Sequence, residues 1–101
     1  MVLLGTGEIT ATVRQNRTED IRQLMLGEMG DFGETNFPSI SRRVRYATDA
    51  QGLWYARGDV MEVLATLHGE AIAREKLRRI SAEFTGLLPS GLNARSSSLT
   101  L

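Results

Sequence analysis

Residues 49–88 contain apolar side chains that recur at helical spacing, and this pattern limits the fold more than any other feature of the chain. In its second half, each apolar residue follows the previous one by four or three positions. We call this set the helical seam: Ala73, Leu77, Ile80, Phe84 and Leu87. Such spacing is typical of the buried side of a packed helix. The seam therefore predicts how the chain packs, and it does not predict a chemical activity.

Two residues divide and end this region. Gly69 interrupts the apolar pattern, and Pro89 follows it. Because the residue before a proline avoids the α conformation, a helix should end just before Pro89. We therefore predict a mainly α-helical domain built on an antiparallel helical hairpin of about residues 49–68 and 70–87, with the seam in its core.

An N-terminal helix is predicted over about residues 18–29. Thr18 is a suitable N-cap, acidic residues follow it, and Gly30 is a natural end. Its apolar face would consist of Ile21, Leu24, Met25 and Met29. We expect residues 31–38 to form a loop, with a short helix after Ser39.

Short β elements are the alternative at two places. Residues 8–14 alternate between apolar and polar side chains, which is compatible with a short strand. Residues 44–56 could form a β-hairpin with Gly52 in its turn, although the apolar stripe from Leu53 to Leu67 favours a helix.

The chain has 101 residues, of which 42% are hydrophobic and 24% charged, and these values are ordinary for one globular domain. We expect a partly frayed N-terminal segment over residues 1–17 and a single helical domain over residues 18–89. Residues 90–101 are rich in serine and polar side chains, so we expect a disordered tail there.

The charges are balanced overall but unevenly distributed along the chain. Residues 1–41 contain three basic and six acidic side chains, and residues 42–101 contain nine basic and six acidic ones. All basic residues except Lys76 are arginine, a composition that suits a GC-rich bacterial genome and also phosphate recognition. The candidate phosphate-binding residues are Arg42, Arg43, Arg45, Arg74, Arg78 and Arg79. Glutamates one turn away, such as Glu70 before Arg74, favour a salt-bridged solvent face instead.

The sequence does not favour catalysis. There is no cysteine and only one histidine, His68, so a conventional zinc site is not expected and no cofactor is predicted. His68 lies at the expected end of a helix, where a histidine is more often a surface or capping group than a proton donor. We therefore expect no enzyme.

The first residues lack a signal-peptide pattern, and no apolar stretch is long enough to cross a membrane, so we expect a cytoplasmic protein without a membrane partner. The favoured function is protein–protein interaction, as a small regulatory or adaptor module that could form a homodimer. The candidate interaction residues are Trp54, Tyr55 and Met61. Nucleic-acid binding through the arginines is the alternative.

Overall fold

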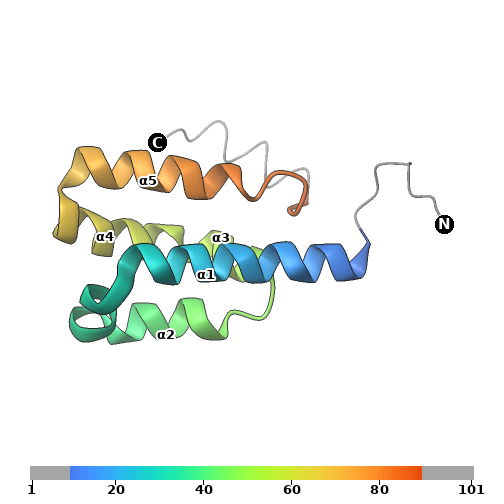
Figure 1. Ribbon diagram of the computed structural model, residues 1–101, viewed down its shortest axis with the longest axis horizontal. Coiled ribbons are helices and arrows are strands. Elements are labelled where there is room, and N and C mark those ends of the chain that lie inside the picture. The colour runs from blue at the N-terminus through green and yellow to red at the C-terminus, as the bar shows by residue number, and fades with distance from the viewer. Residues whose placement is uncertain (1–9, 90–101) are drawn as a thin grey trace.

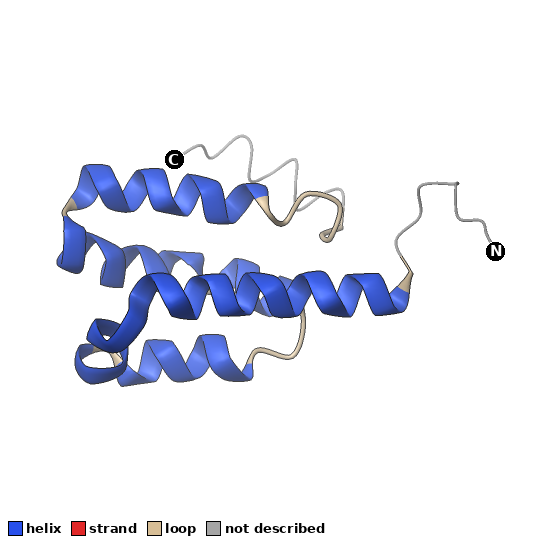
Figure 2. Ribbon diagram, viewed as in Figure 1, coloured by secondary structure: helices blue, strands red, loops and turns tan. Residues whose placement is uncertain are grey.

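The computed structural model describes residues 10–89, and this part of the chain is folded into helices (Figure 1). They are α1 (Ala11–Asn36), α2 (Pro38–Tyr46), α3 (Ala50–Tyr55), α4 (Arg57–His68) and α5 (Glu70–Ala82). The predicted mainly α class is confirmed. Figure 2 shows no strand among the described residues, so both β alternatives are wrong there. Residues 11–14 lie in α1, and residues 44–56 contribute to α2 and α3.

The predicted hairpin is present as α4 packed against α5. Gly69 joins the two helices with a φ of 92°, a backbone conformation that favours glycine. The first arm of the predicted hairpin is divided near Ala56, where α3 ends and α4 begins. The second arm is shorter than predicted, because α5 ends at Ala82 and turns continue the chain to Pro89.

The first helix is longer than predicted at both ends. Thr10, rather than Thr18, caps it, and the Thr10 hydroxyl accepts a hydrogen bond of 3.1 Å from the Val13 amide. Thr18 is instead buried inside α1, where its hydroxyl donates to the Arg14 carbonyl oxygen. Residues 11–17, expected in a frayed segment, are therefore helical. Residues 1–9 and 90–101 lie outside the described residues.

Gly30 bends α1 rather than ending it. Its backbone has φ 55° and ψ −155°, so the helix kinks there and continues to Asn36. The prediction of a loop over residues 31–38 was therefore wrong. Pro38 is the first residue of α2. An amide at this position has no hydrogen-bond partner within the helix, so the missing amide hydrogen of proline does not destabilise it.

The core lies where α1 packs against α2 and α4, and where α4 packs against α5. Four of the five seam residues are buried, and the fifth, Leu77, is partly buried and packs against the core. The largest fully buried side chains elsewhere include Met25, Met29, Leu53 and Leu64. The seam is thus part of the core, as predicted. Phe84 and Leu87 reach it from the turns after α5.

Candidate interaction surface

The predicted interaction residues occupy different environments. Trp54 is 6% exposed, and its ring packs edge-on against Phe84 at a centroid distance of 5.1 Å, so it is a core residue. Met61 is partly buried and packs against the same core. Tyr55, in contrast, is 56% exposed. Of the three, only Tyr55 offers most of its side chain to a partner.

Most of the predicted phosphate-binding arginines have acidic neighbours. Arg43 donates to the Asp59 carboxylate at 2.6 Å, and Arg45 donates to Glu34. On α5, Arg74 lies 3.4 Å from Glu70. Arg78 and Arg79 share the Glu75 carboxylate. Among the six predicted residues, only Arg42 has no acidic partner within residues 10–89.

Three other arginines, all on α1, hold the ends of distant segments. Arg14 donates to the Leu87 carbonyl oxygen at 2.8 Å, and Arg17 donates to those of Glu83 and Thr85. Arg22 donates to three carbonyl oxygens at the end of α2, those of Val44, Arg45 and Ala47, at 2.8 to 3.1 Å. A cation at a helix C-terminus is favoured by the helix dipole and satisfies carbonyls that lack partners. Sequence reasoning missed these contacts because backbone carbonyls carry no sequence signal.

The feature that the structure adds to the sequence prediction is a surface shared by α2 and α3. We define the α2–α3 surface as Arg42, Arg43, Tyr46 and Tyr55. Tyr46 is 69% exposed, and it lies one helical turn from both arginines. The Arg43 guanidinium also donates to the Tyr55 carbonyl oxygen at 3.3 Å, which links α2 to the end of α3.

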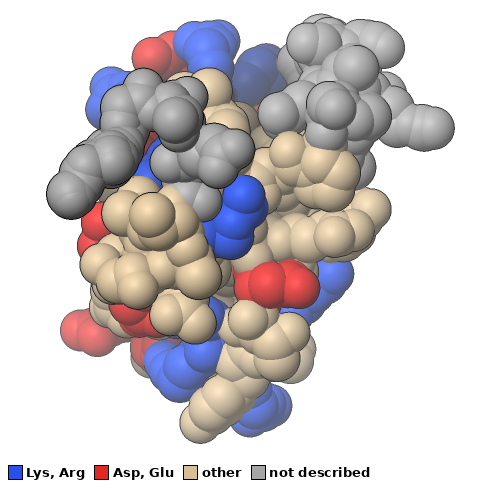
Figure 3. All heavy atoms as spheres, turned by 90° about the vertical axis from the view of Figure 1, so that its right-hand side faces the viewer, with Lys and Arg blue, Asp and Glu red and all other residues tan. Residues whose placement is uncertain are grey.

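Helix α2, which contributes three of these four residues, lies at one edge of the molecule (Figure 1). In Figure 1, α2 runs along the lower edge, and its C-terminal end faces the side drawn in Figure 3. In Figure 3, Lys and Arg side chains lie in the lower part of that side next to acidic and uncharged side chains, and further Lys and Arg side chains lie along its upper edge. Exposed tyrosine and arginine are the residue types most enriched at the energetic centres of protein interfaces.

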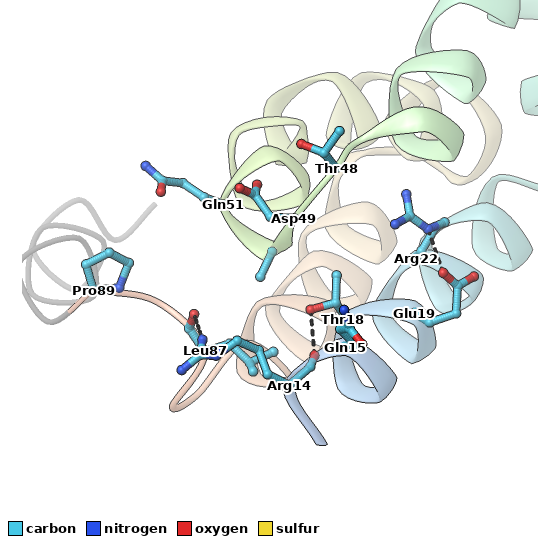
Figure 4. A pocket seen from close by; sticks show the side chains of 11 residues that line it. Arg14, Gln15, Thr18, Glu19, Arg22, Thr48, Asp49, Gln51, Leu87 and Pro89 are labelled. Atoms are coloured by element: carbon cyan, nitrogen blue, oxygen red, sulfur yellow. Dashed lines mark hydrogen bonds and ion pairs between the residues drawn. The ribbon is translucent and has the colours of Figure 1, made fainter. Parts of the chain in front are cut away.

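A hollow of about 540 Å³ with both polar and apolar walls lies between the first half of α1 and the start of α3 (Figure 4). Its walls include Arg14, Thr18, Arg22, Thr48, Asp49 and Gln51. Both arginines are engaged with backbone carbonyls, and the Asp49 carboxylate accepts from the Gly52 amide as the N-cap of α3. The charged groups of Arg14, Arg22 and Asp49 are therefore engaged in contacts that hold the helices and the chain after α5 in place.

Glu19 also borders this hollow. Hydrogen bonds from Gln23 and, to a lesser extent, from Arg22 lower the pKa of the Glu19 carboxyl below its usual 4.5. A carboxyl group with a lowered pKa is a poorer proton donor near neutral pH. Its environment thus favours a structural role for the Glu19 carboxylate.

His68 is exposed at the end of α4, and it forms no hydrogen bond or ion pair with another described residue. Across residues 10–89, no three His, Asp or Glu side chains are arranged to hold a metal ion. None of the helices in the same part of the chain is long and apolar enough to span a membrane. Comparisons with protein-family models, curated proteins and solved structures found no match.

Proposed function

We propose that this chain is a small protein–protein interaction module, regulatory or adaptor in kind, which acts in the bacterial cytoplasm without catalysis. The observation that carries this proposal is the α2–α3 surface. Tyr46 is 69% exposed one turn from Arg42 and Arg43, and Arg43 donates to the carbonyl oxygen of Tyr55, which is 56% exposed. Tyrosine offers a large apolar area and a polar hydroxyl at a small cost in conformational entropy. The exposed, unpartnered position of His68 adds no support for proton transfer.

The test uses the whole chain and two pairs of substitutions. Tyr46→Ala and Tyr55→Ala together remove both exposed rings, while Leu67→Ala and Ile72→Ala remove exposed apolar side chains at the α4–α5 turn. Circular dichroism should show that both double variants remain folded, because all four side chains are substantially exposed. We expect partner binding to depend on the tyrosines. A partner that binds both variants equally well would contradict the proposed surface.

Self-association is a further part of the proposal. Leu67 is 38% exposed and Ile72 is 52% exposed, and both lie close to Gly69 at the turn between α4 and α5. A second copy of the chain could bury these side chains. Sedimentation equilibrium over a wide range of protein concentration should show a reversible dimer that Ile72→Glu weakens. A strict monomer at every concentration would remove this part of the proposal.

Nucleic-acid binding remains the alternative proposal, supported by the number of exposed arginines in the second half of the chain. The ion pairs of Arg43, Arg45, Arg74, Arg78 and Arg79 reduce the support for it, because a paired guanidinium must give up its carboxylate to hold a phosphate. Polarisation titrations with labelled duplex DNA and single-stranded RNA at two salt concentrations distinguish the cases. Phosphate binding would give an affinity that falls steeply with salt.

A further inference from the structure

The α2–α3 surface has an excess of positive charge. Helix α2 contains three arginines and no acidic residue. Asp59 and Glu34, on neighbouring helices, pair with Arg43 and Arg45, so the charge of Arg42 is left uncompensated within the described residues. The side-chain hydroxyls of Tyr46 and Tyr55 also lack hydrogen-bond partners there. The surface therefore presents one uncompensated guanidinium and two exposed phenol groups to its surroundings, a combination that complements negative charge.

The surface is also held in place before any partner arrives. Arg43 joins α2 to both Tyr55 and Asp59 through two hydrogen bonds. At the C-terminal end of α2, Arg22 donates to the carbonyl oxygens of Arg45 and Ala47, on either side of Tyr46. A surface fixed in advance loses less conformational entropy on binding. Arg42 and Tyr46, one turn apart on α2, are thus presented on a helix whose position relative to the end of α3 is fixed.

We propose that the α2–α3 surface binds an acidic segment of another protein. The Arg42 guanidinium would donate two parallel hydrogen bonds to a carboxylate of this segment, and an apolar side chain of the same segment would pack against Tyr46 or Tyr55. This inference rests on the proposed function, and it adds the chemical class of the partner. An acidic peptide fits better than a nucleic acid, since one uncompensated arginine suits a single carboxylate, whereas a phosphate backbone requires several free cations in a row.

The experiment selects binders from a displayed library of random twelve-residue peptides, with the whole chain as bait. We expect the selected peptides to be enriched in aspartate and glutamate relative to the starting library. Arg42→Ala should weaken their binding about tenfold, which corresponds to about 1.4 kcal/mol. Arg42→Lys should restore only part of the loss, because lysine keeps the charge but lacks the planar fork. Arg74→Ala, an exposed arginine on α5, is the matched control and should have no effect.

The possible results separate the inference from the proposed function. Selected peptides that require Tyr46 and Tyr55 but show no acidic enrichment would overturn the inference and leave the proposed function standing. Peptides that bind the double tyrosine variant as well as the wild type, or a selection that enriches no peptide, would overturn both. Tighter binding to labelled single-stranded RNA than to any selected peptide, lost in Arg42→Ala, would replace the acidic partner with a nucleic acid.

Discussion

The guanidinium of Arg57 lies over the indole ring of Trp54, with its central carbon 3.4 Å from the ring centroid. The same guanidinium donates to the Trp54 carbonyl oxygen at 3.1 Å and to the Ser81 hydroxyl at 3.0 Å. Partial burial lowers the pKa of the Arg57 guanidinium below its usual value, because desolvation disfavours the charged form. One side chain thus joins α4 both to the end of α3 and to α5, where Ser81 lies.

Arg57→Lys should destabilise the fold by about 1 kcal/mol, because lysine cannot stack flat on the indole while it also donates to two acceptors. The measurement is urea unfolding followed by the fluorescence of Trp54, the single tryptophan of the chain. Arg74→Lys is the control, since Arg74 forms only an exposed ion pair, and its stability should change by less than about 0.5 kcal/mol. Equal effects of the two substitutions would contradict a structural role for the stack.

The parts of the fold that the sequence predicted are those that depend on periodic burial. The seam residues Ala73 and Ile80 are buried because their spacing places them on one side of α5, whichever helix lies opposite. The predicted division at Gly69 was also correct, since a glycine with a positive φ stands there. Local patterns of this kind are readable without any knowledge of the tertiary structure.

The remaining parts depend on contacts between distant segments. Threonine is a common N-cap residue, and Thr18 was therefore predicted to begin the helix. It is instead buried within α1, because the helix begins about two turns earlier, after its N-cap Thr10. The contacts of Arg14, Arg17 and Arg22 with backbone carbonyls could not be predicted either. Arg22, for example, contacts carbonyl oxygens that are more than twenty residues away in the sequence. For the α2–α3 surface, the sequence predicted Tyr55, Arg42 and Arg43 as separate candidates. Tyr46 lies one turn from both arginines on α2, but Tyr55 meets Arg43 only once α3 is positioned beside α2.

Substitution by alanine should change the stability of the fold in opposite directions at Gly30 and Gly27. Gly30 has φ 55° and ψ −155°, a conformation that costs a residue with a Cβ about 1–3 kcal/mol, so Gly30→Ala should destabilise the fold by that amount. Gly27 lies in the regular part of α1, and Gly27→Ala should stabilise the fold by about 0.5–1 kcal/mol. An added Cβ meets no atom within 4 Å at either position, so differential scanning calorimetry of the two variants isolates the backbone effect.

Ser41 should be replaceable by alanine with a gain in stability. Its side chain is 1% exposed, and its hydroxyl oxygen has no hydrogen-bond partner among residues 10–89. Because burial of an unpaired hydroxyl is unfavourable, Ser41→Ala should stabilise the fold by about 1 kcal/mol in urea unfolding. Ser81→Ala is the matched contrast, since that hydroxyl accepts a hydrogen bond from Arg57, and it should destabilise by about 1 kcal/mol. A loss of stability in Ser41→Ala would show that its hydroxyl is satisfied in solution.

The Glu19 carboxyl should titrate below its usual pKa of 4.5, chiefly because Gln23 donates a hydrogen bond to it. A lowered pKa in the folded state means that this group stabilises the fold above its unfolded pKa, and the contribution disappears as the pH falls through the folded value. Gln23→Ala should therefore raise the pKa of Glu19, as followed by carbon NMR of the carboxyl group. Gln15→Ala, one turn before Glu19 and without a hydrogen bond to it, should leave the titration unchanged.

Replacement of Arg22 should loosen α2 more than any other helix. The Arg22 guanidinium donates to three carbonyl oxygens at the end of α2 and to Glu19, and its side chain is only 14% exposed. Arg22→Met keeps much of the apolar stem and removes the donors, so it should destabilise the fold by about 2 kcal/mol. Hydrogen exchange read residue by residue should accelerate first in α2, while exchange in α4 follows global stability. If the proposed peptide binding depends on the position of Tyr46, Arg22→Met should also lower the affinity for the peptide, although Arg22 lies outside the α2–α3 surface.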